Sequence, residues 1–145
     1  MLSDIAILSK RGEPILLVEV KNKTGTSKDW AAKLRRNIMA HGVLPKAPYF
    51  LVATPDHFYL WKDASDSVKE LEPSYEIDPN SIPNPLFTPG EEIGPVELET
   101  KVASWLNRIM SSQPEHTNGS IGDLLSRSGL REAIKGGRLA FESQP

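Results

Sequence analysis

The chain has 145 residues, a net charge of −2 at pH 7, 39% hydrophobic residues and no cysteine. That length suits one domain with a substantial core, and no apolar run approaches the roughly 20 residues of a membrane-spanning helix. The lack of cysteine excludes disulfides, thiolate catalysis and cysteine zinc sites. We expect a cytoplasmic protein with no membrane association, because the first residues do not form a secretory signal.

Positive charge is concentrated in the first third of the chain. Residues 1–46 contain nine lysines and arginines against four acidic residues, whereas residues 47–145 contain eight against fifteen. A basic surface of this kind suits a polyanion such as nucleic acid. The alternative explanation for any one of these residues is a solvated helix face.

Two short apolar runs near the N-terminus predict a β-hairpin. The first covers residues 4–8, and the second, residues 15–21, is rich in β-branched and aliphatic residues. Arg11 and Gly12 between them are a turn signal, because glycine readily adopts a positive φ. Strands joined by so short a turn must be antiparallel neighbours.

The register of this hairpin decides which polar side chains meet. With a two-residue loop, Leu8 faces Ile15 and Asp4 faces Glu19. Opposed residues have Cβ atoms roughly 4.5–5.5 Å apart, and Lys21 shares the face of Glu19 because the side-chain period of a strand is two. The hairpin therefore predicts that the two carboxylates and the ammonium come together.

The next segments predict a helix followed by two strands. Ser27 is a candidate N-cap for a helix that continues to about Ala40. The continuous apolar run at 48–53 is typical of a strand buried on both faces, and a further strand follows at 57–61. Three residues form the apolar stripe of the helix: Trp30, Leu34 and Ile38. Four others are interpreted as its polar positions: Lys33, Arg35, Arg36 and Asn37. The order ββαββ, with a parallel crossover through the helix, follows.

The remaining chain is predicted to add to this core. We divide the chain into a core at 1–72, a proline-rich extended segment at 73–95, an amphipathic helix at 96–112 that packs on the core, and a C-terminal arm at 113–145. The arm contains a short helix and a short strand. The three histidines lack metal-ligand spacing and are interpreted as cap, strand or loop residues.

The stretches Ser-Asp-Ile-Ala-Ile-Leu and Leu-Val-Glu-Val-Lys-Asn-Lys contain Asp4 and Glu19-Val20-Lys21. Together with the basic helix after them, they resemble the PD-(D/E)XK phosphodiesterases, the restriction-endonuclease-like superfamily. The chain is similar to the nuclease domain of type I restriction subunits and to small uncharacterised cyanobacterial relatives. The resemblance covers residues 3–62. It implies an α/β fold with a restriction-endonuclease-like core, a mixed central sheet and flanking C-terminal helices.

The same residues suggest a metal-dependent chemistry. Two carboxylates suit Mg²⁺ or Mn²⁺, which prefer hard oxygen ligands. Asp4 and Glu19 would be metal ligands, with the Val20 carbonyl as a third ligand by the resemblance. Lys21 would orient or deprotonate the attacking water and neutralise the transition state. The candidate nucleic-acid contacts are four residues after the motif: Lys23, Lys33, Arg36 and Asn37.

The expected function is divalent-metal-dependent hydrolysis of nucleic acid by a DNA endonuclease. A homodimer or a larger restriction or repair assembly is expected, because cleavage of two strands needs two sites. The alternative is a catalytically inactive nuclease-fold module that binds nucleic acid or a protein partner. In that case the hairpin would simply carry a salt bridge from Glu19 to Lys21 or Lys23.

One departure from the family pattern carries a structural expectation. Members usually have a helix and a strand before the aspartate, and only three residues precede Asp4. We expect a C-terminal segment or a second protomer to fill that place. The candidates within the chain are the strand at 137–142 and the helix at 98–110.

Overall fold

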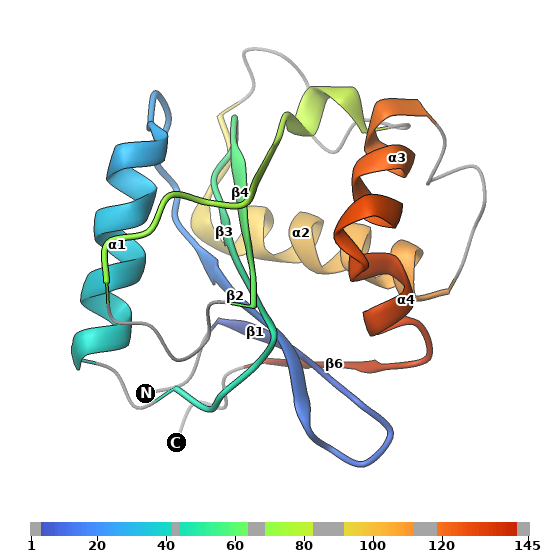
Figure 1. Cartoon of the computed structure of the whole chain (residues 1–145). Coiled ribbons are helices and arrows are strands. Elements are labelled where there is room, and N and C mark those ends of the chain that lie inside the picture. The colour runs from blue at the N-terminus through green and yellow to red at the C-terminus, as the bar shows by residue number, and fades with distance from the viewer. Residues whose placement is uncertain (1–3, 42–43, 64–68, 83–91, 112–118, 142–145) are drawn as a thin grey trace.

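A single open mixed sheet organises the part of the chain that the computed structural model describes, residues 4–41, 44–63, 69–82, 92–111 and 119–141 (Figure 1). Within these ranges the strand order is β5-β4-β3-β2-β1-β6. The strands are β1 (Ile5–Leu8), β2 (Pro14–Val20), β3 (Tyr49–Ala53), β4 (Phe58–Lys62), β5 (Tyr75–Ile77) and β6 (Arg138–Phe141). The helices are α1 (Lys28–His41), the 3-10 turn η1 (Pro79–Ser81), α2 (Pro95–Met110), α3 (Gly119–Ser128) and α4 (Leu130–Ile134). The chain is therefore an α/β protein.

Helices cover both faces of the sheet, and each face has its own apolar core. Helix α1 lies on one face, and α2, α3 and α4 lie on the other (Figure 1). The larger core includes Leu16, Leu51 and Trp105, which belong to the α2–α4 side. The smaller core includes Leu17 and Tyr59, which lie beneath α1. None of the helices in the described ranges is long and apolar enough to span a membrane.

The β1–β2 register is as predicted along most of its length. Ile5 pairs with Val18, and Ile7 with Leu16. The expected pairing of Leu8 with Ile15 is wrong, because Leu8 pairs with Pro14 and the register shifts at this point. The shift leaves Ile15 as an extra residue in β2, which is the geometry of a β-bulge.

The connecting loop explains the shift. Ser9 N–H donates to the Glu13 carbonyl at 2.8 Å, and Gly12 N–H donates to the Ser9 carbonyl at 2.9 Å. Gly12 has a φ of +85°, so the loop is a turn closed by a left-handed glycine and has three residues, 10–12. The two-residue loop is therefore wrong. The bulge takes up the extra loop residue and restores the pairing that places Asp4 opposite Glu19.

The predicted crossover through α1, with β2 and β3 parallel, is confirmed. Ser27 Oγ accepts the Trp30 amide at 3.2 Å and so caps α1. Strand β3 runs parallel to β2 and is buried along its whole length. Thr54 N–H donates to the His57 carbonyl at 2.8 Å, which closes the β3–β4 hairpin.

The buried side of α1 differs from the predicted one. Ala31, Ala32 and Arg35 are its buried residues, so Arg35, which was grouped with the polar positions of the helix, lies on its buried side. Its guanidinium carbon lies 5.9 Å from the centroid of the Trp61 ring, and burial lowers its pKa. A long aliphatic stem and stacking on an aromatic ring allow arginine to pack in this way.

The C-terminal half completes the sheet at both edges. Strand β5, which lies in the segment predicted to be extended, pairs with β4. Strand β6 pairs with β1, and α2 contacts both β2 and β6. A C-terminal strand therefore fills the place beside β1. Residues 83–91 of the proline-rich segment and 112–118, where the amphipathic helix meets the C-terminal arm, lie outside the described ranges.

The C-terminal arm contains two helices, α3 and α4, where the sequence predicts one short helix at 124–134 with a break at Gly129. Gly129 separates α3 from α4 with a φ of +78°, a conformation that favours glycine. Tyr49 OH donates to the Ser128 carbonyl at 2.7 Å and so ties the end of α3 to β3. This contact holds the helix pair against the sheet.

Candidate functional site

A row of side chains crosses the α1 face of the sheet through the candidate site. Glu19 of β2 pairs with Val52, Val52 with Tyr59, and Tyr59 with Glu76 of β5. The hairpin register continues this row to Asp4 on the other side of Glu19. Because paired residues point to the same face, three carboxylates and one phenol lie on the side of the sheet that α1 covers in part.

Asp4 is held by the backbone at the end of β2. Its Oδ2 accepts the Val20 amide at 2.7 Å. Lys21 N–H donates to the Ala53 carbonyl at 2.9 Å, so the preceding amide and carbonyl, those of Val20, point the other way, toward β1. A carboxylate has about four acceptor positions, so this one hydrogen bond orients Asp4 and leaves room for a ligand.

Glu19 is a buried carboxylate with a cation beside it. Its side chain is 4% exposed, that of Lys21 is 43% exposed, and Lys21 Nζ lies 3.8 Å from Glu19 Oε1. Burying a carboxylate costs free energy unless polar or charged neighbours compensate, and Lys21 supplies part of that compensation. A salt bridge from Glu19 to Lys21, which the non-catalytic explanation of the motif expects, is therefore present. The same contact places the Lys21 ammonium beside Asp4 and Glu19.

The donor set of the two carboxylates fits a hard divalent cation. Asp4 and Glu19 offer carboxylate oxygens, and the Val20 carbonyl points toward the same strand edge, which are the ligand types that Mg²⁺ prefers. Among residues 4–41, 44–63, 69–82, 92–111 and 119–141, no group of three or more acidic or histidine side chains is placed to hold a metal ion. Asp4 and Glu19 are two carboxylates, and Mg²⁺ is often held by one or two carboxylates together with phosphate and water.

Among the predicted nucleic-acid contacts, Lys23 is the one beside the motif. Its Nζ lies 5.6 Å from the centroid of the Trp30 ring, within the range of a cation–π contact. Lys23 is exposed and lies two residues after Lys21. The structure therefore brings this lysine to the same end of β2 as the carboxylates.

The three helix residues are exposed but lie further along α1. Lys33 Nζ is 2.8 Å from Asp29 Oδ2, and this hydrogen bond raises the lysine pKa. Arg36 Nη1 is 3.0 Å from Glu70 Oε1, in the connection before β5. Arg36 and Asn37 lie roughly 12–14 Å along the axis from the first helical residue at 1.5 Å per residue. The structure thus places these residues away from the motif, two of them in exposed ion pairs.

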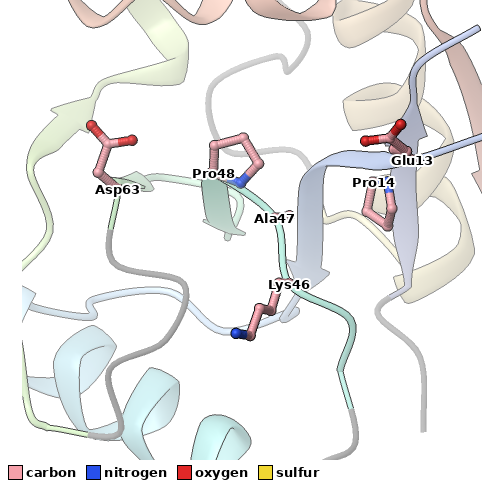
Figure 2. A pocket seen from close by; sticks show the side chains of 6 residues that line it. All are labelled: Glu13, Pro14, Lys46, Ala47, Pro48 and Asp63. Atoms are coloured by element: carbon pink, nitrogen blue, oxygen red, sulfur yellow. The ribbon is translucent and has the colours of Figure 1, made fainter.

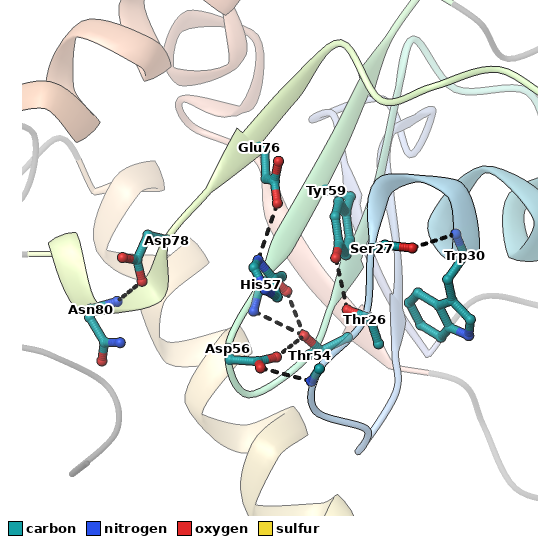
Figure 3. A network of polar contacts seen from close by, with 11 residues as sticks. Thr26, Ser27, Trp30, Thr54, Asp56, His57, Tyr59, Glu76, Asp78 and Asn80 are labelled. Carbon is teal, nitrogen blue, oxygen red and sulfur yellow. Dashed lines mark hydrogen bonds and ion pairs between the residues drawn. The ribbon is translucent and has the colours of Figure 1, made fainter.

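A polar network that the sequence reasoning missed fixes the β2–α1 loop (Figure 3). Gly25 N–H donates to Asp56 Oδ2 at 2.9 Å, and the hydroxyls of Thr26 and Tyr59 are 2.8 Å apart. Thr54 Oγ1 donates to Asp56 Oδ1 at 3.1 Å. The loop that follows Lys21 is therefore tied to the β3–β4 turn and to β4.

His57 and Glu76 extend this network to the sheet edge. His57 Nδ1 lies 3.1 Å from Glu76 Oε1, and the His57 ring stacks on Tyr59 with centroids 5.7 Å apart. Burial raises the pKa of Tyr59, the Glu76 and Asp56 carboxylates add to this rise, and the Thr26 hydrogen bond opposes it. Alternation in β4 could have placed His57 and Tyr59 on one face, but no sequence signal identified β5.

One pocket lies beside the motif and another lies far from it. The first has a volume of about 420 Å³ and is lined by Asn22, Thr24, Pro55, Glu92 and Ile93. The second has a volume of about 520 Å³ and lies at the start of β2 and β3 (Figure 2). It is lined by Glu13, Pro14, Lys46, Ala47, Pro48 and Asp63. The length of β2 separates it from Lys21 by roughly 20 Å at 3.3 Å per residue, so it does not belong to the candidate site.

Comparisons with protein-family models, with curated proteins and with solved structures find no match to this chain.

Proposed function

We propose that this chain is a divalent-metal-dependent phosphodiesterase that hydrolyses DNA as an endonuclease. One observation carries the proposal: the β1–β2 hairpin pairs Ile5 with Val18, and this register brings Asp4 opposite the buried Glu19, which lies beside Lys21. Two carboxylates that face each other repel unless a cation lies between or beside them. Lys21, whose Nζ lies 3.8 Å from Glu19 Oε1, supplies one positive charge beside this pair, and a bound divalent cation would supply more.

The architecture supports a restriction-endonuclease-like core. The order of β1, β2, α1, β3 and β4 is the ββαββ order that the resemblance implies. Strand β6 lies against β1, where the family has a strand before its aspartate. In this chain the strand beside β1 is supplied by residues 138–141.

Each residue of the motif has a role in this proposal. Asp4, Glu19 and the Val20 carbonyl would hold Mg²⁺ or Mn²⁺. The bound ion would lower the pKa of a water and stabilise negative charge on the phosphate. Lys21, half-exposed and beside Glu19, would orient the attacking water through its ammonium and neutralise charge as it develops. Removing one preorganised group of this kind typically lowers the rate by about 10²–10³-fold.

The nucleic acid would approach the end of β2, where Lys23 is exposed beside the motif. Lys33, Arg36 and Asn37 would contact DNA further along α1, with exposed ion pairs that are weak and readily exchanged. One protomer has one such site, so cleavage of both strands requires a homodimer or a larger restriction or repair assembly.

The test is cleavage of supercoiled and linear DNA with Mg²⁺, with Mn²⁺ and with a chelator. Glu19→Gln and Lys21→Met keep the side-chain sizes and remove the charges. Their matched controls are Glu13→Gln and Lys46→Met, which change exposed residues at the distant pocket. We expect metal-dependent nicking that falls at least 100-fold in the first pair and stays unchanged in the second.

A second candidate function rests on the 3.8 Å contact between Lys21 and Glu19. If this contact serves only to compensate a buried acid, the chain is a catalytically inactive nuclease-fold module that binds nucleic acid or a protein partner. DNA binding without cleavage in the parent chain and in every variant would support that function. Absence of both DNA binding and cleavage would refute both nucleic-acid functions.

A further inference from the structure

The smaller pocket begins one residue after the catalytic motif. Lys23 N–H donates to the Lys21 carbonyl at 2.9 Å, which makes a three-residue turn with Asn22 at its apex. Asn22 lines the pocket of about 420 Å³, a volume within the usual range of small-ligand sites. A group bound there would lie directly beside any phosphate held at Lys21.

Hydrogen bonds fix two walls of this pocket. Asn22 Nδ2 donates to the Ile93 carbonyl at 2.8 Å, which ties the loop to the segment before α2. Gly25 N–H donates to Asp56 Oδ2 at 2.9 Å, which ties the same loop to the turn that contains Pro55. The pocket is therefore held open in advance, and a ligand need not order the loop when it binds.

The lining selects a neutral, hydrogen-bonding group. Pro55 and Ile93 provide apolar walls, while Asn22, Thr24 and Glu92 provide an amide, a hydroxyl and a carboxylate. The Glu92 carboxylate repels a phosphate, so the phosphates belong with Lys21 and Lys23 outside the pocket. A flat ring between apolar walls, with polar groups at its edge, matches these features.

We infer that this pocket binds a nucleobase next to the phosphate that is cleaved, and that Glu92 accepts a hydrogen bond from an exocyclic amino group on that base. The inference rests on the proposed function. Carboxylates are suited to the amino group of cytosine, and thymine has no exocyclic amino group. The pocket therefore favours cytosine over thymine.

The test measures binding without cleavage. The whole chain is mixed with chelator, and fluorescence anisotropy follows labelled single-stranded octamers of deoxycytidine, of thymidine and of abasic residues. The three probes carry equal phosphate charge, and single strands avoid the cost of unstacking a base from a duplex. We expect the cytosine octamer to bind roughly tenfold more tightly than the other two, within the range of one specific base contact.

Two variants and a matched control identify the pocket. Glu92→Gln should weaken the preference for cytosine over thymine without breaking the Asn22–Ile93 tether, because a neutral amide oxygen is a weaker acceptor than a carboxylate. Asn22→Ala should reduce the preference for the cytosine octamer over the abasic octamer. Glu97→Gln removes the same charge from an exposed position on α2 and should keep the parent preference. This control separates base recognition from a general change in charge.

The outcomes distinguish this inference from the proposed function. Equal binding of all three octamers would overturn the base pocket and leave the endonuclease proposal standing. A Glu92→Gln effect no larger than that of Glu97→Gln would also overturn it. Failure to bind any octamer, together with failure to bind or cleave duplex DNA, would overturn both.

Discussion

Gly137 is the position at which one added carbon should loosen the strand that supports Asp4. A Cβ at Gly137 would lie 2.8 Å from the Leu8 carbonyl oxygen, 3.0 Å from Ile7 Cγ2 and 3.1 Å from the Ile134 carbonyl oxygen. Two of these atoms are main-chain oxygens, which can move only if β1 or α4 moves. Gly137→Ala should therefore separate β6 from β1 at the start of β6.

The expected cost is that of overpacking a tight site, about 1–3 kcal/mol of the free energy of unfolding. For a chain of this size, that loss lowers the melting temperature by roughly 3–10 °C. Denaturant unfolding and thermal melting would measure both quantities. Gly94→Ala is the control, because a Cβ there meets nothing within 4 Å and the loss of a glycine N-cap costs less than about 1 kcal/mol.

If Gly137→Ala is no less stable than Gly94→Ala, the close packing of β6 against β1 is wrong. Such a result would also argue against β6 as the strand that pairs with β1. A larger loss of DNA cleavage than of stability at working temperature would show that β6 also orders the site.

Three further predictions concern the network and the basic surface. Burial raises the pKa of Tyr59 above its ordinary value of 10.0. The contribution of this phenol to the free energy of unfolding is therefore constant below pH 10, and it falls at higher pH because the phenol ionises more readily in the unfolded chain. In melting temperatures measured at increasing pH, Tyr59→Phe should make this fall smaller. The part that remains comes from Tyr49, whose pKa burial also raises. Thr26→Val removes the hydroxyl that contacts Tyr59 OH and should lower the free energy of unfolding by about 1–3 kcal/mol. Adding Tyr59→Phe should recover part of this loss. If the losses of the two single variants simply add in the double variant, the Thr26–Tyr59 hydrogen bond is contradicted. Lys23→Ala should reduce the slope of log K for DNA binding against log salt concentration by about one, whereas Lys46→Ala should leave this slope unchanged. Equal slopes in the two variants would show that Lys23 does not contact DNA.

Local sequence signals predicted the correct register along most of the hairpin, although they missed the loop length and the bulge that together produce it. Alternation and the glycine signal predicted the pairing of Ile5 with Val18, and that pairing is present. The loop has three residues rather than two, and the bulge at Ile15 cancels the difference. Nothing in the apolar run at 15–18 distinguishes a bulged residue from a paired one, because every residue in it is aliphatic.

The edges of the sheet could not be predicted in the same way. Strand β5 has three residues in a proline-rich segment, too few to show a period. The pairing of β6 with β1 joins Phe141 to Ile5 across almost the whole chain. The family resemblance named residues 137–142 as one of two candidates for this place, but no periodicity within either strand indicates the pairing. Arg35 was misassigned because helix phase was read from hydrophobicity alone, and its stem packs as an apolar group.

The candidate site likewise contains residues whose proximity the sequence predicts and contacts that it does not predict. Asp4, Glu19 and Lys21 come from one hairpin, so local periodicity was enough to bring them together. The His57–Glu76 contact joins β4 to the unpredicted β5, and the Asn22–Ile93 bond joins segments 71 residues apart. Contacts of this kind depend on how the elements pack, and no period within either segment encodes them.

The most direct test of the account is titration of the whole chain with Mn²⁺, followed by electron paramagnetic resonance of the free ion. We predict one site per chain, with affinity reduced at least tenfold in both Asp4→Asn and Glu19→Gln and unchanged in Glu13→Gln. Competition by Mg²⁺ should release the bound ion. Failure of the parent chain to bind Mn²⁺, or equal binding by all three variants, would contradict the metal site on which the proposed hydrolysis depends.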